Sequence, residues 1–166
     1  MLGALLKSVG FRWGRGTGGV SVILLIKYCS LICFAGPRSR LQELQQTAKS
    51  KHDLEFLMGV EVEFQLMKPA TESTPAQQVQ TSSHPYSTAS LRNAYLPVLE
   101  EIVSSLVKAG VQIRQFHGEG ARGFFEITGE PLAPLEAADT LVFMQETIRS
   151  VCSNRGLHAT LFPKPL

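Results

Sequence analysis

The sequence predicts an α+β fold in which helices flank a largely antiparallel sheet. Three observations predict it: an alternating strand at residues 59–67, two alternating strands around a Gly-containing turn at residues 111–130, and two amphipathic helices after residues 90 and 133. The order strand, helix, strand, strand, helix, strand is typical of an antiparallel sheet with helices packed on it. We therefore expect one domain between residues 37 and 166.

Composition supports one globular domain and argues against a nucleic-acid partner. The chain has 166 residues, 44% of them hydrophobic, and a net charge of +2. Residues 1–40 carry six basic and no acidic side chains, whereas residues 41–166 carry ten basic and fourteen acidic ones. Because the part expected to fold is mildly acidic, we expect no nucleic acid to bind it.

Residues 1–36 form a basic and apolar leader that is atypical of a folded domain. Its apolar stretch, residues 20–36, contains Lys27 and falls short of the roughly 20 residues that span a bilayer as a helix. A mitochondrial transit peptide, a membrane anchor, an amphipathic surface segment and a misjoined reading frame all stay open for the leader. The expected location is the cytoplasm, which suits three cysteines without a CxxC pair.

The first expected elements are a polar helix and a strand. Residues 37–52 have apolar side chains at helical spacing, and Pro37 suits a first turn. The segment GVEVEFQLM, residues 59–67, alternates apolar and polar side chains, as strands with one buried face do. One face of this strand therefore carries both Glu61 and Glu63.

A loop and a second helix follow. Residues 68–90 are rich in Thr, Ser, Gln and Pro and lack periodicity, so we expect a long mobile loop. Residues 90–110 predict an amphipathic helix that ends at Gly110, with Pro97 in its first turns or at a kink. Its expected buried stripe is Leu91, Tyr95, Leu99, Ile102, Leu106 and Ala109.

The C-terminal third predicts a hairpin, a helix and a last strand. The hairpin strands are residues 111–119 and 123–130, and the helix runs from Pro134 to a cap at Gly156. Residues 157–162 alternate as the last strand. The side chains of the helix expected to face inward are Leu135, Ala138, Val142, Thr147 or Ile148, and Val151.

Four glutamates on these strands are candidate metal ligands. Glu61 and Glu63 share a face of the first strand, while Glu119 and Glu126 flank the hairpin turn, close to His117. On one sheet face their like charges would cost on the order of several kcal/mol unless cations neutralise them. Hard ions such as Mg²⁺ or Mn²⁺ suit carboxylates. A solvated strand face is the commoner cause of such spacing, so both interpretations stay open on the residues alone.

Longer stretches point to a known family. The chain contains, in order, GVEVEFQLM, LPVLEEIVSSLVKAGVQIRQFHGE and LAPLEAADTLVFMQETIRSVCSNRGLHATLFPKP. Together they resemble the first part of the glutamine synthetase catalytic domain, in its FluG-like branch. The resemblance is strong over residues 54–166, looser from Pro37, and absent over residues 1–36. It implies that residues 37–166 are a partial catalytic domain with an incomplete form of that fold.

The resemblance also implies a function. It implies an ATP-dependent ligase that phosphorylates glutamate and joins it to ammonia, or to a larger amine, with Mg²⁺ or Mn²⁺ bound. The metal-binding glutamates of the family fall on Glu61, Glu63, Glu119 and Glu126. Homo-oligomers, or association with full-length relatives, are the expected assemblies.

Two departures from the family limit this expectation. Between the hairpin glutamates the chain reads E-G-A-R-G-F-F-E, with Arg122 and Phe124 where proline and glutamine are usual. The family's later His-bearing segment, its ATP-binding arginines and its N-terminal β-grasp domain have no match. We therefore assign no catalytic residue and expect no ligase turnover from this chain alone. The alternative function is a non-catalytic binding or regulatory module that associates with full-length relatives.

Overall fold

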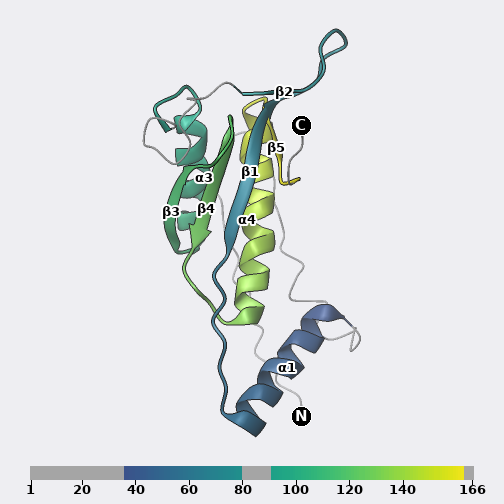
Figure 1. Ribbon diagram of the computed structural model, residues 1–166, viewed down its shortest axis with the longest axis vertical. Helices are drawn as coiled ribbons and strands as arrows, with labels where there is room; N and C mark the ends of the chain where they lie inside the picture. Colours follow the sequence, from purple (N-terminus) through teal and green to yellow (C-terminus); the bar gives the residue numbers. More distant parts are fainter. Residues whose placement is uncertain (1–35, 80–90, 163–166) are drawn as a thin grey trace, which may run out of the picture.

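A computed structural model of the chain describes residues 36–79 and 91–162 (Figure 1). The predictions for the leader, and those for residues 80–90 of the loop, lie outside the described residues. The described helices and strands are α1 (Pro37–His52), β1 (Glu61–Lys68), β2 (Gln77–Gln78), α3 (Leu96–Lys108), β3 (Ile113–Gly118), β4 (Phe124–Gly129), α4 (Pro134–Asn154) and β5 (His158–Thr160).

The sheet is antiparallel throughout, which confirms the predicted α+β class. Its strand order is β2-β1-β4-β3, and β5 also pairs with β1. Gln65 of β1 pairs with Phe124 of β4 and with Thr160 of β5, so β4 and β5 flank β1 on opposite sides. Both α3 and α4 lie against one face of the sheet, behind it in the view of Figure 1. The opposite face is free to carry polar side chains.

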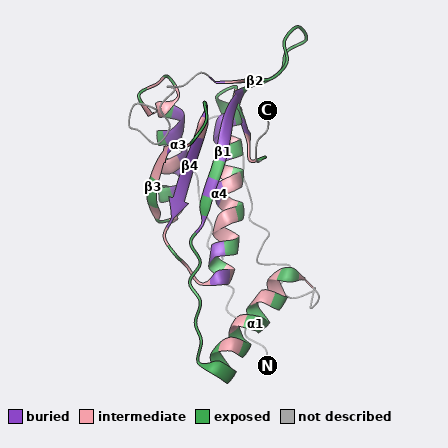
Figure 2. Cartoon of the chain, viewed as in Figure 1, coloured by how far each residue is buried: buried purple, intermediate pink, exposed green. Residues whose placement is uncertain are grey.

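The core lies between the sheet and these two helices. Phe64 of β1 and Phe125 of β4 are opposite each other, fully buried, with ring centroids 6.1 Å apart. Figure 2 shows buried residues along β4 and much of β1. The helices contribute Leu99, Ile102, Leu106, Met144 and Ile148, all fully buried. Burying apolar surface stabilises such a layer by about 25 cal/mol per Å².

Two expectations for α3 and the preceding loop need correction. The helix begins at Leu96 and not near residue 90, because Pro97 occupies its first turn and has no N–H to donate to an earlier turn. The loop is also less irregular than expected, since Gln77 and Gln78 form β2 against the end of β1. The predicted stripe is confirmed at its centre, where Leu99, Ile102 and Leu106 are buried.

The buried face of α4 was predicted correctly in its C-terminal part, where Ile148 and Val151 are buried, and in the wrong phase in its N-terminal part. Ala138 and Val142 are exposed, and Leu135 is only half-buried. Residues spaced by three or four still form one stripe, as a 3.6-residue repeat requires. The stripe includes the long side chain of Met144, which fills the core between the sheet and α3. Its buried members are Pro134, Ala137, Met144, Ile148, Val151 and Cys152.

The helix α1 has the predicted bounds but lies apart from the sheet, at the end of an extended segment (Figure 1). None of its residues is buried. Arg38 joins it to α4 through a bidentate ion pair with Asp139, whose N–O distances are 3.0 and 2.6 Å. Such a pair on the surface contributes about 1 kcal/mol or less. This attachment of α1 is therefore weak.

Beside α1, residues 54–58 leave large apolar side chains in contact with solvent. Leu57 is 76% exposed, and Phe56 is 55% exposed. Together with Leu41, Leu44 and Met58 they line a hollow of about 250 Å³, which we call the apolar hollow. Exposed apolar patches occur at protein–protein and membrane interaction sites and at ligand-binding grooves.

Two further observations concern the Cys152 thiol and the length of the described helices. Burial raises the pKa of the Cys152 thiol to about 12, so the side chain stays protonated and unreactive at neutral pH. Among the described helices, none is long and apolar enough to cross a membrane.

The assignment of the core predicts that truncation of two side chains of α3 changes stability by very different amounts. Ile102→Ala should lower the free energy of unfolding by about 2–5 kcal/mol, because it leaves a cavity under a fully buried side chain. Val107→Ala is the control, since Val107 is exposed, and it should cost less than about 0.5 kcal/mol. Urea denaturation followed by circular dichroism measures both. Equal effects would contradict the assignment of the core.

Candidate metal centre

The hairpin of β3 and β4 brings a histidine and two glutamates together on the sheet face away from the helices. His117 pairs in register with Glu126, so both side chains project from the same face. Glu119 follows β3 directly, and its N–H donates to the Phe124 carbonyl at 2.9 Å, which closes the hairpin. One ligand atom from each residue lies within 4.8 Å of the others. We call His117, Glu119 and Glu126 the carboxylate cluster.

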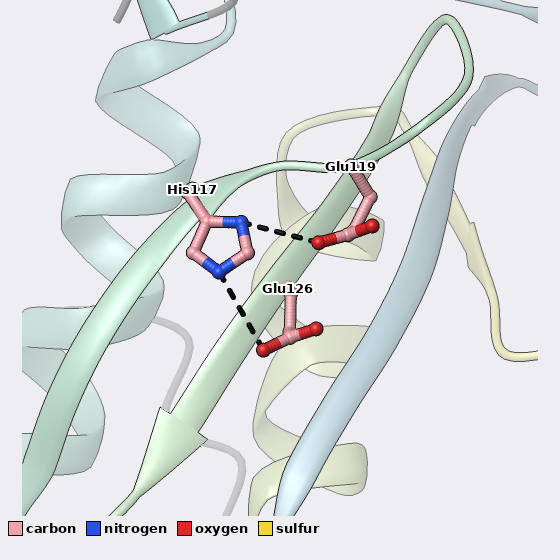
Figure 3. A group of neighbouring side chains, drawn as sticks. All are labelled: His117, Glu119 and Glu126. Atoms are coloured by element: carbon pink, nitrogen blue, oxygen red, sulfur yellow. Dashed lines mark ion pairs between the residues drawn. The ribbon is translucent and has the colours of Figure 1, made fainter. Parts of the chain in front are cut away.

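The imidazole of His117 lies between the two carboxylates (Figure 3). Its Nδ1 is 3.2 Å from Glu119 Oε1, and its Nε2 is 3.5 Å from Glu126 Oε1. A neutral imidazole donates from one ring nitrogen only, whereas the charged form donates from both. The ring therefore lies within contact distance of both acidic groups.

Further donors fix the carboxylates. The Thr128 hydroxyl donates to Glu126 Oε1 at 2.8 Å, and the Gly120 N–H approaches Glu119 Oε2 at 3.3 Å. Glu126 is only 8% exposed. A carboxylate held this far from water has few partners other than these donors and a cation. Its position is thus defined before any ligand binds.

The two glutamates of β1 lie on the same face but outside the carboxylate cluster. Glu63 is directly opposite Glu126 in the β1–β4 ladder, and Glu61 is opposite Thr128. Both are exposed. The structure therefore brings Glu119 and Glu126 together with His117, and it places Glu61 and Glu63 beside them. The predicted set of four glutamate ligands stays a prediction.

Sequence reasoning gave His117 too little weight. Its nearness to Glu119 in the chain was visible, but its partnership with Glu126 depends on the register of the hairpin. A one-residue shift of that register would turn His117 to the other face. The signal that could have found it is strict alternation from Gln115 to Glu119, which puts residues 115, 117 and 119 on one side.

A tight turn joins the strands that carry the cluster. Gly123 has a φ of +72°, and a Cβ there would lie 3.0 Å from Val79 Cγ2 and 3.1 Å from the Leu66 carbonyl oxygen. The Gly123 carbonyl accepts the Leu66 N–H at 2.8 Å, which ties the turn to β1. Only glycine combines this backbone conformation with so close an approach.

Comparison with known proteins gives one consistent result. The sequence model of the glutamine synthetase catalytic domain matches residues 34–166. The chain is 32% identical over 133 residues to the protein fluG of Emericella nidulans. The aligned region covers 78% of this chain and 15% of that protein. It is 29% identical over 141 residues to type-1 glutamine synthetase 1 of Dictyostelium discoideum, covering 81% of this chain and 28% of that protein.

A third curated relative and two solved structures agree. Gamma-glutamylpolyamine synthetase GlnA3 of Streptomyces coelicolor is 30% identical over 129 residues, covering 78% of this chain and 27% of that protein. Ligand-free GmaS superposes with a TM-score of 0.68 at 32% identity, over 79% of this chain and 31% of that one. Plasmodium falciparum glutamine synthetase, at 20% identity and a TM-score of 0.66, shares the fold over 78% of this chain and 31% of that one.

The chain is thus similar to a part of each relative. It spans 15–28% of the length of these three curated proteins. The matched part contains every strand of the described sheet and both sides of the carboxylate cluster.

The close packing of the turn predicts that alanine is less well tolerated at Gly123 than at Gly156. Gly123→Ala should lower the free energy of unfolding by at least about 1 kcal/mol more than Gly156→Ala. Both glycines have a positive φ, but a Cβ at Gly156 would meet no atom within 4 Å. The control therefore isolates the steric contact from the backbone strain. Equal losses in urea denaturation would show that the approach of Val79 and Leu66 to the turn is not close.

Proposed function

The chain belongs to the glutamine synthetase family through its catalytic domain, and from this premise we propose that its carboxylate cluster binds Mg²⁺ or Mn²⁺ for an ATP-dependent ligase. The observation that carries the proposal is the convergence of His117, Glu119 and Glu126 within 4.8 Å. Carboxylate oxygens are the ligands that Mg²⁺ and Mn²⁺ prefer, and an imidazole is compatible with Mn²⁺.

The glutamates of β1 complete this proposal. Because Glu63 lies opposite Glu126 in the sheet, its side chain can reach a cation held at the carboxylate cluster. Glu61 is one position further along the same face and is also exposed, so it can turn toward the same ions. We therefore keep Glu61, Glu63, Glu119 and Glu126 as the proposed metal ligands, with His117 beside them.

The residues around the cluster prepare it for charged substrates. The Thr128 hydroxyl and the Gly120 N–H orient the two carboxylates, so little rearrangement is needed when a cation arrives. A bound divalent cation supplies charge neutralisation for the phosphate groups of a nucleotide during phosphoryl transfer. The buried position of Glu126 strengthens these electrostatic interactions, because fewer water molecules screen them.

The relatives indicate the substrates of the proposed ligase. They are named as glutamine synthetases and as a gamma-glutamylpolyamine synthetase. We propose glutamate and ATP as substrates, ammonia or a larger amine as acceptor, a homo-oligomer as assembly and the cytoplasm as location. In this proposal the chain contributes cation ligands, and turnover requires further groups from the parts of the relatives that it does not span. It is therefore not expected to turn over alone.

Cation binding can be measured on the chain directly. Isothermal titration with Mn²⁺ should show saturable uptake, and Glu126→Gln should weaken it at least about tenfold, because the variant loses a ligand charge. Glu100→Gln removes an exposed glutamate from α3, far from the cluster in the fold, and should leave the affinity unchanged. Absence of Mn²⁺ and Mg²⁺ uptake by the unaltered chain would refute the proposed function.

A second candidate function has its own support. The exposed apolar side chains of residues 54–58 and the apolar hollow favour association with another protein chain. In addition, β5 pairs only with residues 65–67 of β1. On the side of β1 that faces β5, the backbone at Glu61 and Glu63 therefore has no partner strand among the described residues. Both features suit a non-catalytic module that associates with full-length relatives or with copies of itself.

Association predicts a concentration-dependent mass. Sedimentation at micromolar concentration should show oligomers, and Leu57→Glu should shift them toward monomer, because Leu57 is the most exposed large apolar residue among those that the structure describes. Val142→Glu is the matched control, at an exposed apolar position of α4 outside the apolar hollow. A monomeric unaltered chain would refute this second candidate.

A further inference from the structure

One polar side chain of β1 is completely buried. Gln65 has no exposed surface, although its neighbours on the same face, Glu61 and Glu63, are exposed. Glutamine is seldom fully buried unless its amide is hydrogen-bonded, because taking a carboxamide out of water costs free energy. Its place in the strand therefore needs an explanation.

Gln65 lies on the carboxylate face of the sheet. The register places it opposite Phe124, two positions along the ladder from the pair Glu63 and Glu126. Residues two apart on a strand project from the same face, and diagonal neighbours across two strands are roughly 7–8 Å apart. A side chain as long as glutamine spans such a distance. Gln65 is thus a neighbour of the carboxylate cluster and not a member of the apolar core on the other face.

Its amide nitrogen holds the turn that joins the two hairpin glutamates. Gln65 Nε2 donates to the Arg122 carbonyl oxygen at 3.0 Å. Arg122 lies between Glu119 and Glu126 and precedes Gly123, whose carbonyl is bonded to the next residue of β1. The hydrogen bond is part-buried and joins β1 to the turn.

The other end of the carboxamide has no partner. Gln65 Oε1 is buried and makes no hydrogen bond within the described part of the chain. Leaving such an acceptor unsatisfied costs about 1–3 kcal/mol. An apolar side chain of the same size would avoid that cost. A glutamine kept here for packing alone would thus be a poor choice, which argues for a role of the amide in the site.

We infer that Gln65 is a positioning residue of the metal site. It holds the 119–123 turn through the Arg122 carbonyl, and this turn would present Glu119 to a cation. This inference rests on the proposed cation binding, and it adds a residue from outside the acidic set.

The variant Gln65→Met tests the inference, because methionine matches glutamine in length and lacks both polar groups. Mn²⁺ affinity, measured by isothermal titration on the full 166-residue chain, should fall about 10–100-fold, as it does when groups that orient metal ligands are removed. In the metal-free chain, trypsin should cleave after Arg122 about 2–10-fold faster, because one hydrogen bond that closes the turn is lost. Unfolding by urea should occur at the same or a higher midpoint, because the unsatisfied acceptor is gone.

Gln115→Met is the matched control, since Gln115 lies on the same face, opposite Thr128, but is exposed. It should change none of the three measurements. Equal Mn²⁺ affinity in Gln65→Met and the unaltered chain would overturn the inference. A parallel fall in affinity and in the urea midpoint would also overturn it, because a merely structural residue behaves that way.

The two proposals fail in different ways. If the unaltered chain binds no Mn²⁺, the proposed function and the role of Gln65 toward a cation both fall. Cleavage after Arg122 in the metal-free chain still decides whether Gln65 holds the turn. If the unaltered chain binds Mn²⁺ and Gln65→Met binds it equally well, only the inference about Gln65 fails.

Discussion

The antiparallel pairing of β1 with β4 is the constraint on which the rest of this structure depends. It places Phe64 opposite Phe125 on one face and Glu63 opposite Glu126 on the other. Because side chains alternate along a strand, the same register that builds the apolar core also brings acidic groups together. Burial of the apolar core therefore offsets the repulsion between the carboxylates on the other face. A shift in the register of the two strands would change the side-chain pairs on both faces.

Local patterns predicted most of the elements, while contacts between distant segments decided the rest. The bounds of α1 and the alternation of β1 follow from neighbouring residues alone, and both predictions are confirmed. The two-residue strand β2 has no such pattern, since it exists only where Gln77 and Gln78 meet the end of β1. The buried phase of α4 was likewise set by the surface that it covers, where Met144 and not Val142 faces the core.

The candidate site shows the same division. Four glutamates stood out because they are charged, and the pairing of β1 with β4 places Glu61 and Glu63 beside Glu126. His117 gains its importance from the approach of its Nε2 to Glu126 on the neighbouring strand, and Gln65 from its hydrogen bond to the Arg122 carbonyl, and both contacts depend on the register of the sheet. Neutral polar residues carry no charge signal, so a sequence pattern alone passes over them even where they are fully buried.

The hairpin of β3 and β4 also bears on how the site assembles in time. Its strands are close in sequence, and closing so short a loop costs little entropy, whereas β1 must join from a distant part of the chain. Histidine and two carboxylates can accordingly meet on the nascent hairpin while the chain is still being made, with the remaining acidic residues arriving only at the final docking step. Under the proposed function, a cation would meet two of the four proposed glutamate ligands on this hairpin before β1 docks.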